Sequence, residues 1–287
     1  MALTNNDIIA RIQAIVRDTT TYTSSVVLAF VNRSLRKAAG SVLMPELASS
    51  DTVQTQVIDI ASITAATPMV VNTTAVHGLT SGDLVILSGC DAVPTLNGSH
   101  IITVTDTDTF TLDGSTSTAV DAAEDYGDAL VAYVSLPSDY HRELQHCYSQ
   151  NQEWSIKVHS PNQWAEFLRV YPELDECGSV ESVCVRGKRL YYQPVPSAVE
   201  TLRIYYYRLP TDSAADTNYP DGIPEQFADN FLIYDASAEI LLERGMTEKA
   251  GHYAGLAGAE MDKIRQFYGP DDVPPEYTPD DGFYTSF

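Results

Sequence analysis

The sequence predicts an α+β protein with a helical bundle core, a small antiparallel sheet, an inserted all-β domain and an extended C-terminal tail. Three observations predict it. Apolar residues recur at helical spacing near both ends of the chain. Residues 61–128 are instead rich in Thr, Ser, Gly and Asp, with short apolar runs between turns. The last nineteen residues, 269–287, contain four prolines and five acids and cannot form a helix.

The first sixty residues predict two helices and one strand. The first helix is expected to begin at a cap provided by Asn5 or Asn6. The second covers about residues 25–39 and is expected to stop at Gly40. A strand-like run follows at 53–60.

The all-β domain is expected at residues 61–128, inserted into a loop of the core. Turn residues separate its predicted strands, and the run 129–136 returns to the pattern of the strand before the insertion. The core would therefore consist of residues 1–60 and 129–268. The strands predicted within the insertion are 84–87, 100–105 and 109–112.

The second half of the core mixes helices and strands. Ser138 is expected to cap a helix that extends to about Tyr148. The segment 160–163 reads as a capping box for a helix that stops before Pro172. The predicted strands that follow are 180–185, 190–193 and 202–208.

Two long helices are expected to close the core, separated by a break at Arg244-Gly245. The last helix has Gly251, Gly255 and Gly258 along one side. Each glycine costs a helix about 1 kcal/mol relative to alanine. This stripe therefore predicts a close helix contact, either within the chain or between subunits.

The charge balance restricts the partners. Lys and Arg number 17 against 39 Asp and Glu, a net charge of −22, and no Lys or Arg occurs between Lys37 and Arg142. Wrapping DNA or binding an anionic membrane needs a basic face, whereas a channel through which DNA slides does not. The sequence shows no signal peptide and no apolar run long enough to cross a bilayer. The four cysteines are expected to be reduced thiols, and whether Cys177 and Cys184 pair is left open.

No motif predicts an enzyme or a cofactor. Acids are so frequent that candidate pairs for a glycosidase lack any distinguishing context; they are Glu173, Asp175 and Glu176, or Glu225 and Asp229. A zinc site at His141, His146 and Cys147 has the wrong spacing, and Asp106 and Asp108 fit a β-turn better than a calcium loop. The run Tyr205–Tyr207 could stack on bases or sugars, but alternate residues of a strand face opposite sides, which favours packing.

Several segments resemble the head-to-tail adaptor proteins of tailed phages. They are Leu-Pro-Ser-Asp-Tyr at 136–140, Leu-Tyr-Tyr-Gln-Pro-Val-Pro at 190–196, Leu-Arg-Ile-Tyr-Tyr-Tyr-Arg-Leu-Pro at 202–210 and Ile-Pro-Glu-Gln-Phe-Ala-Asp at 223–229. The insertion is similar to a small β-domain that recurs in phage virion proteins, through the segments 77–83, 96–100 and 108–112.

The resemblance implies a structural virion protein without catalysis, assembled in the host cytoplasm. It implies a homo-dodecameric ring beneath the portal protein, with a tail or nozzle protein below and DNA passing through the channel without specific binding. The composition of the C-terminal tail predicts a docking segment with Tyr277, Phe283, Tyr284 and Phe287 as anchors, and the resemblance implies that the portal is its partner. Two alternatives stay open: another tail component whose β-domain binds a host glycan, and a cell-wall hydrolase. The phage, the tail partner and the role of the β-domain are not predicted.

Overall fold

The computed structural model describes residues 3–150, 155–170 and 177–268. Its contacts divide the chain into two compact units. We call residues 1–49 and 207–287 the helical unit and residues 50–206 the β unit. Each is described by itself.

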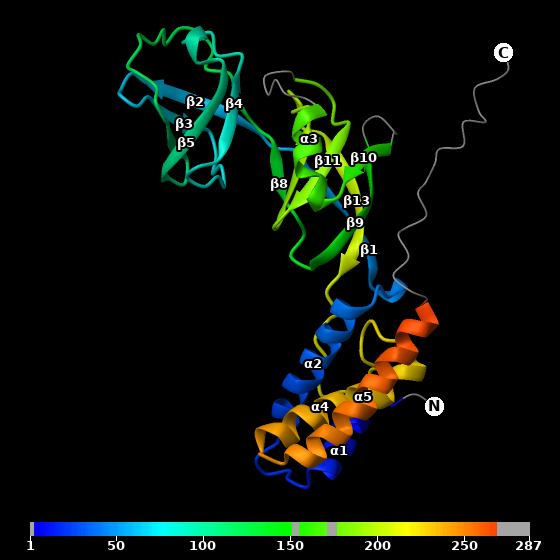
Figure 1. Ribbon diagram of the computed structural model, residues 1–287. Coiled ribbons are helices and arrows are strands. Elements are labelled where there is room, and N and C mark those ends of the chain that lie inside the picture. Colours follow the sequence, from blue (N-terminus) through cyan, green and yellow to red (C-terminus); the bar gives the residue numbers. More distant parts are fainter. Residues whose placement is uncertain (1–2, 151–154, 171–176, 269–287) are drawn as a thin grey trace, which may run out of the picture. The chain divides into compact units, whose positions relative to one another are not determined.

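The helical unit contains four helices that lie side by side (Figure 1). They are α1 (Asn5–Val16), α2 (Ser24–Ser41), α4 (Glu225–Glu243) and α5 (Thr247–Tyr268), and α1, α2 and α5 all pack on α4. These helices confirm the helical spacing read from the sequence. Two details were wrong: Thr4, in a capping box with Asp7, caps α1 in place of Asn5 or Asn6, and α2 continues through Gly40 to Ser41.

The core of the helical unit is built from the apolar faces of these helices. Ile8 and Ile12 of α1 contribute to it, as do Val31 and Leu35 of α2. Full burial of such a side chain stabilises the fold by about 1.5–3 kcal/mol. The members contributed by α4 and α5 include Phe231, Leu232, Ile240, Met261 and Ile264.

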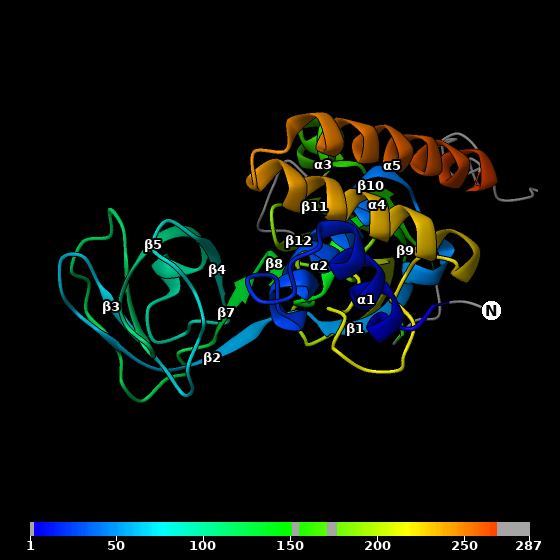
Figure 2. The ribbon, with the colours of Figure 1, turned by 90° about the horizontal axis from the view of Figure 1, so that it is seen from below.

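The first part of the β unit is a closed six-stranded barrel (Figure 2). Going around it, the order is β2-β3-β6-β5-β4-β7, and all neighbours pair antiparallel. Closure leaves no open strand edge. The strands are β2 (Val57–Thr64), β3 (Val70–Thr73), β4 (Leu84–Ser88), β5 (Gly98–Asp106), β6 (Thr109–Leu112) and β7 (Asp128–Val131).

A seven-stranded sheet forms the second layer of β-structure, in the order β1-β13-β9-β10-β11-β12-β8. Strands β10 and β11 are parallel, and the short helix α3 (Trp164–Val170) lies in the connection between them. The predicted capping box is present between Ser160 and Gln163 ahead of α3. The strands are β1 (Ala48–Gln54), β8 (Tyr133–Ser135), β9 (Tyr140–Ser149), β10 (Ser155–His159), β11 (Ser182–Arg186), β12 (Arg189–Gln193) and β13 (Thr201–Arg208).

The predicted fold class is therefore wrong. The described chain is mostly β, with a closed barrel and a second, curled sheet, and its helices do not form the core of the whole fold around a small sheet. The clearest error concerns the helix expected from Ser138 to Tyr148. That segment is β9, in which Cys147 and Ser149 are buried while Tyr148 between them is exposed, the alternation of a half-buried strand.

The barrel strands extend from Val57 to Val131, and the predicted insertion covers residues 61–128. Whether this module folds by itself and serves as an insertion stays a prediction. The run expected as one strand at 53–60 divides between β1 and β2. Among the described residues, no helix is long and apolar enough to cross a membrane.

Candidate functional site

The segment His-Gly-Leu-Thr-Ser-Gly-Asp at 77–83 folds as a tight polar turn ahead of β4. The Asp83 carboxylate accepts hydrogen bonds from the backbone N–H and the hydroxyl of Thr80, at 2.7 and 2.9 Å. Gly82 adopts a φ of +92°, in the left-handed region that favours glycine. The backbone N–H of Leu79 donates to Nδ1 of His77 at 2.9 Å. The segment thus builds a turn that presents one carboxylate.

Arg189 of β12 and Tyr133 of β8 bind this carboxylate from the seven-stranded sheet. The guanidinium of Arg189 lies 2.6 Å from Oδ1 of Asp83 and 4.0 Å from the centre of the Tyr133 ring. The Tyr133 hydroxyl donates to Oδ2 of Asp83. Only 7% of the Asp83 side chain is exposed. The cluster Asp83–Arg189–Tyr133 therefore connects the barrel to the sheet inside the β unit.

The cluster keeps Asp83 ionised. Burial opposes its charge, but hydrogen bonds from Arg189, Tyr133 and Thr80 outweigh that effect and lower the pKa of the carboxyl. Burial and the neighbouring carboxylate raise the pKa of the Tyr133 hydroxyl. The hydroxyl stays protonated and acts as a donor, so the cluster is a structural ion pair with its hydrogen bonds satisfied.

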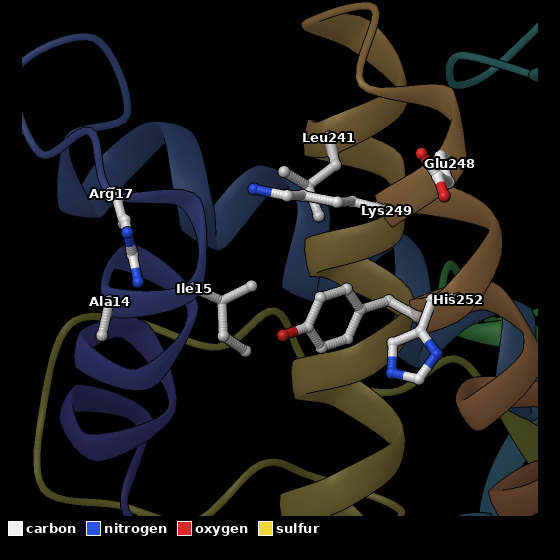
Figure 3. Close-up of a pocket in the computed structure, with 8 residues that line it drawn as sticks. Ala14, Ile15, Arg17, Leu241, Glu248, Lys249 and His252 are labelled. Carbon is white, nitrogen blue, oxygen red and sulfur yellow. The ribbon is translucent and has the colours of Figure 1, made fainter.

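The helical unit has an open groove of about 810 Å³ between the end of α1 and the start of α5 (Figure 3). Figure 3 shows Arg17 and Ile15 on one side of it and Lys249 extending from the other. Its lining is Ala14, Ile15, Arg17, Leu241, Glu248, Lys249, His252 and Tyr253. Apolar and basic side chains thus line one open hollow.

Within the described chain, six of the ten Lys and Arg side chains of the helical unit form ion pairs, but the two in this groove do not. Arg33, Arg36 and Lys37 bind Glu239, Asp212 and Asp235. Neither Arg17 nor Lys249 has an ion pair or side-chain hydrogen bond with any residue that the structure describes. The groove is therefore a candidate site for an acidic ligand.

The predicted interface residues fall in two places. Gly251, Gly255 and Gly258 lie on α5, all exposed, and a Cβ added to any of them would meet nothing within 4 Å. Within the described chain, the stripe thus makes no close helix contact, and a contact between subunits stays a prediction. The tail anchors Tyr277, Phe283, Tyr284 and Phe287 lie outside the described residues.

Of the five acids considered for catalysis, the structure describes the side chain of Asp229. Glu173, Asp175 and Glu176 lie outside the described residues, as does the side chain of Glu225. Asp229 accepts a hydrogen bond from the backbone N–H of Leu3 at 3.0 Å, a structural role.

The residues considered for metal binding are placed in strands and turns. Of the considered zinc ligands, Cys147 is buried, and burial raises the pKa of its thiol to about 12. In the β5–β6 turn, Asp106 accepts from the N–H of Thr107. No group of three or more potential ligands lies together among the described residues. None of the four cysteines, all of which lie among the described residues, forms a disulfide, so Cys177 and Cys184 do not pair.

Neither the Asp83–Arg189–Tyr133 cluster nor the groove was predicted from the sequence. The turn 77–83 was noticed, but its partner Arg189 lies 106 residues further along the chain and no local signal connects them. The absence of Lys and Arg from residues 38–141 could have indicated such a long-range ion pair, because a buried acid in that stretch must bind a cation from another part of the chain. The groove cations come from the end of one helix and the start of another.

The described residues thus offer two contact surfaces, an open groove with two cations and an exposed glycine stripe. Such surfaces are typical of structural proteins that work in assemblies. A family model described as "SU10 adaptor protein" matches residues 100–274, more than half of the sequence. The chain belongs to this family, which confirms the resemblance to phage adaptors and makes it a structural component of a bacteriophage virion. No curated protein matches the sequence.

Proposed function

We propose that this adaptor forms a ring beneath the portal of a tailed phage, extends the DNA channel and provides the attachment site for the tail. The family match carries the proposal, since it covers the sheet strands from β8 to β13 and the helices α3 to α5. Twelve copies in a homo-dodecamer are the expected stoichiometry, with a tail or nozzle protein on the side away from the portal.

The charge supports a channel role. Each subunit has a net charge of −22, and a ring of such subunits repels a DNA backbone of the same sign. DNA would therefore pass without specific binding. Catalysis has no part in this proposal.

The C-terminal segment 269–287 is proposed to attach the ring to the portal through Tyr277, Phe283, Tyr284 and Phe287. Large aromatic side chains are frequent anchors of binding segments. The five acids of the segment predict a basic site on the portal and binding that weakens as salt rises.

Native mass spectrometry of the purified chain, with and without portal rings, tests the proposal. We expect a dodecamer bound to the portal, and loss of that complex in a truncation that ends at Tyr268. A chain that stays monomeric and does not bind portal rings under conditions in which the portal is intact would contradict it.

A further inference from the structure

We propose that the groove between α1 and α5 binds the end of this chain's own C-terminal segment, Asp280 to Phe287, in the free subunit. The inference concerns the subunit before assembly and does not depend on portal binding. It assigns an occupant to the groove and a first binding site to the segment.

The groove offers two kinds of contact at once. Arg17 and Lys249 supply positive charge that no described acid neutralises. Ile15 and Leu241 supply apolar surface beside them (Figure 3). Tyr253 adds an aromatic side chain to the lining. A ligand that fits needs acidic and apolar or aromatic residues close together.

The charges near the groove leave these cations available. Glu248 is the acid in the lining. Asp18, next to Arg17, accepts hydrogen bonds from the N–H groups of Thr20 and Thr21. Arg244 donates to the carbonyl oxygen of Val16. Arg17 and Lys249 outnumber Glu248, so an incoming pair of carboxylates would still meet a net positive charge in the lining.

The C-terminal segment has the required composition. It contains five acids, no Lys or Arg and four aromatic residues. Its last part has Asp280 and Asp281 followed by Phe283, Tyr284 and Phe287. Acids for the two cations and aromatic rings for the apolar surface thus occur within the last eight residues.

The length of the segment between Tyr268 and its acids also favours Asp280 and the residues after it. Lys249 lies nineteen positions before Tyr268, the end of α5, or about 29 Å at about 1.5 Å per helical residue. An extended chain covers about 3.3 Å per residue, so about nine residues are needed to return. Asp271 and Asp272 are too close to the helix end, whereas Asp280 and the residues after it can reach the groove.

Limited chymotrypsin digestion of the full chain tests the proposal, with cleavage after Phe283 and Tyr284 followed by mass spectrometry. We expect Arg17→Glu with Lys249→Glu to accelerate this cleavage roughly five- to tenfold, the effect of losing two exposed ion pairs. The matched control is Arg169→Glu with Lys188→Glu, two exposed cations of the β unit, which changes the net charge equally and should leave the rate unchanged.

A charge exchange makes the test specific. Adding Asp280→Lys and Asp281→Lys to the groove variant should restore protection to within about twofold of the original chain, because the ion pairs form again with reversed signs. Equal cleavage rates in the groove and control variants would overturn the proposal. Protection that increases with protein concentration would also overturn it, since the segment would then come from another copy.

Discussion

The helical unit and the β unit use their basic residues in different ways. In the helical unit, six of the ten Lys and Arg side chains form ion pairs, and one groove contains two, Arg17 and Lys249, that form none with a described residue. The barrel of the β unit contains no Lys or Arg, and its buried Asp83 is neutralised by Arg189 from the adjacent sheet. Among its described residues, the helical unit thus has two unpaired cations in one groove, whereas Arg189 of the β unit binds a buried acid and connects the barrel to the adjacent sheet.

This difference separates residues that stabilise the subunit from residues that serve assembly. Changes in the β unit should appear mainly in the free energy of unfolding. Changes on the exposed side of α5 should leave folding intact and affect contacts between molecules.

The largest effect is expected for Gly127→Ala in the barrel. Gly127 has a φ of +68°, and an added Cβ would overlap the carbonyl oxygen of Ser88 and lie 2.6 Å from the carbonyl carbon of Gly89. Because both neighbours are backbone, neither can give way cheaply. We expect a loss of about 3 kcal/mol or more in the free energy of unfolding, measured by urea denaturation. An unchanged midpoint of urea unfolding would contradict the close approach of Gly127 to the backbone of Ser88 and Gly89.

A second large effect is expected for Arg189→Met. The change leaves Asp83 nearly buried without its cation, which should cost about 2–3 kcal/mol. Asp83→Asn in the same protein should recover part of the loss, because it removes the unpaired charge. Lys188→Met, at the neighbouring exposed turn, is the control and should change stability by less than about 0.5 kcal/mol. Equal losses at the two positions would show that the ion pair does not connect barrel and sheet.

The β unit should also respond to pH through His159. This side chain is 1% exposed, and burial, with a smaller effect of Lys157, lowers its pKa below the ordinary value of 6.5. As pH falls below 6.5, the unfolded chain takes up the proton first, so this histidine reduces stability there and has no effect well above 6.5. We expect the melting temperature to fall less between pH 7.5 and 5 in His159→Phe than in the original chain. His146→Gln, at an exposed position, serves as control; an identical fall in all three proteins would contradict the assignment.

The smallest effect, and of opposite sign, is expected for Gly255→Ala in α5. Nothing lies within 4 Å of the added Cβ, so alanine should stabilise the isolated subunit by about 0.5–1 kcal/mol. If the stripe packs against a neighbouring subunit, the same change should weaken ring formation in native mass spectra. Stabilisation together with unimpaired rings would remove the glycine stripe from the interface.

The two units also differ in how far the sequence predicted them. Ile8 and Ile12, or Phe231 and Leu241, repeat at helical spacing within one segment, and the four helices were predicted from that local signal. Strand β9 was not, because Ser138 resembles a helix cap and one of the two strands beside β9 in the sheet is β13, more than fifty residues further along the chain. Strands β3 and β10, four and five residues long, are too short for a clear pattern.

The candidate sites could not be predicted from local sequence patterns either, because their residues are far apart in the chain. Asp83 and Arg189 meet only because β4 and β12 are brought together by the fold, and Arg17 and Lys249 meet only because α1 and α5 both pack near the same end of α4. The family resemblance was carried by short segments that can be read without the fold.

The most direct test of the account is the position of this chain in the phage particle, determined by electron cryo-microscopy of intact virions. We predict density for the described helical and β units as a ring at the head–tail junction, in contact with the portal on one side and the tail on the other. Density for the chain at the tail tip or on fibres, with the junction occupied by another protein, would contradict the proposed function.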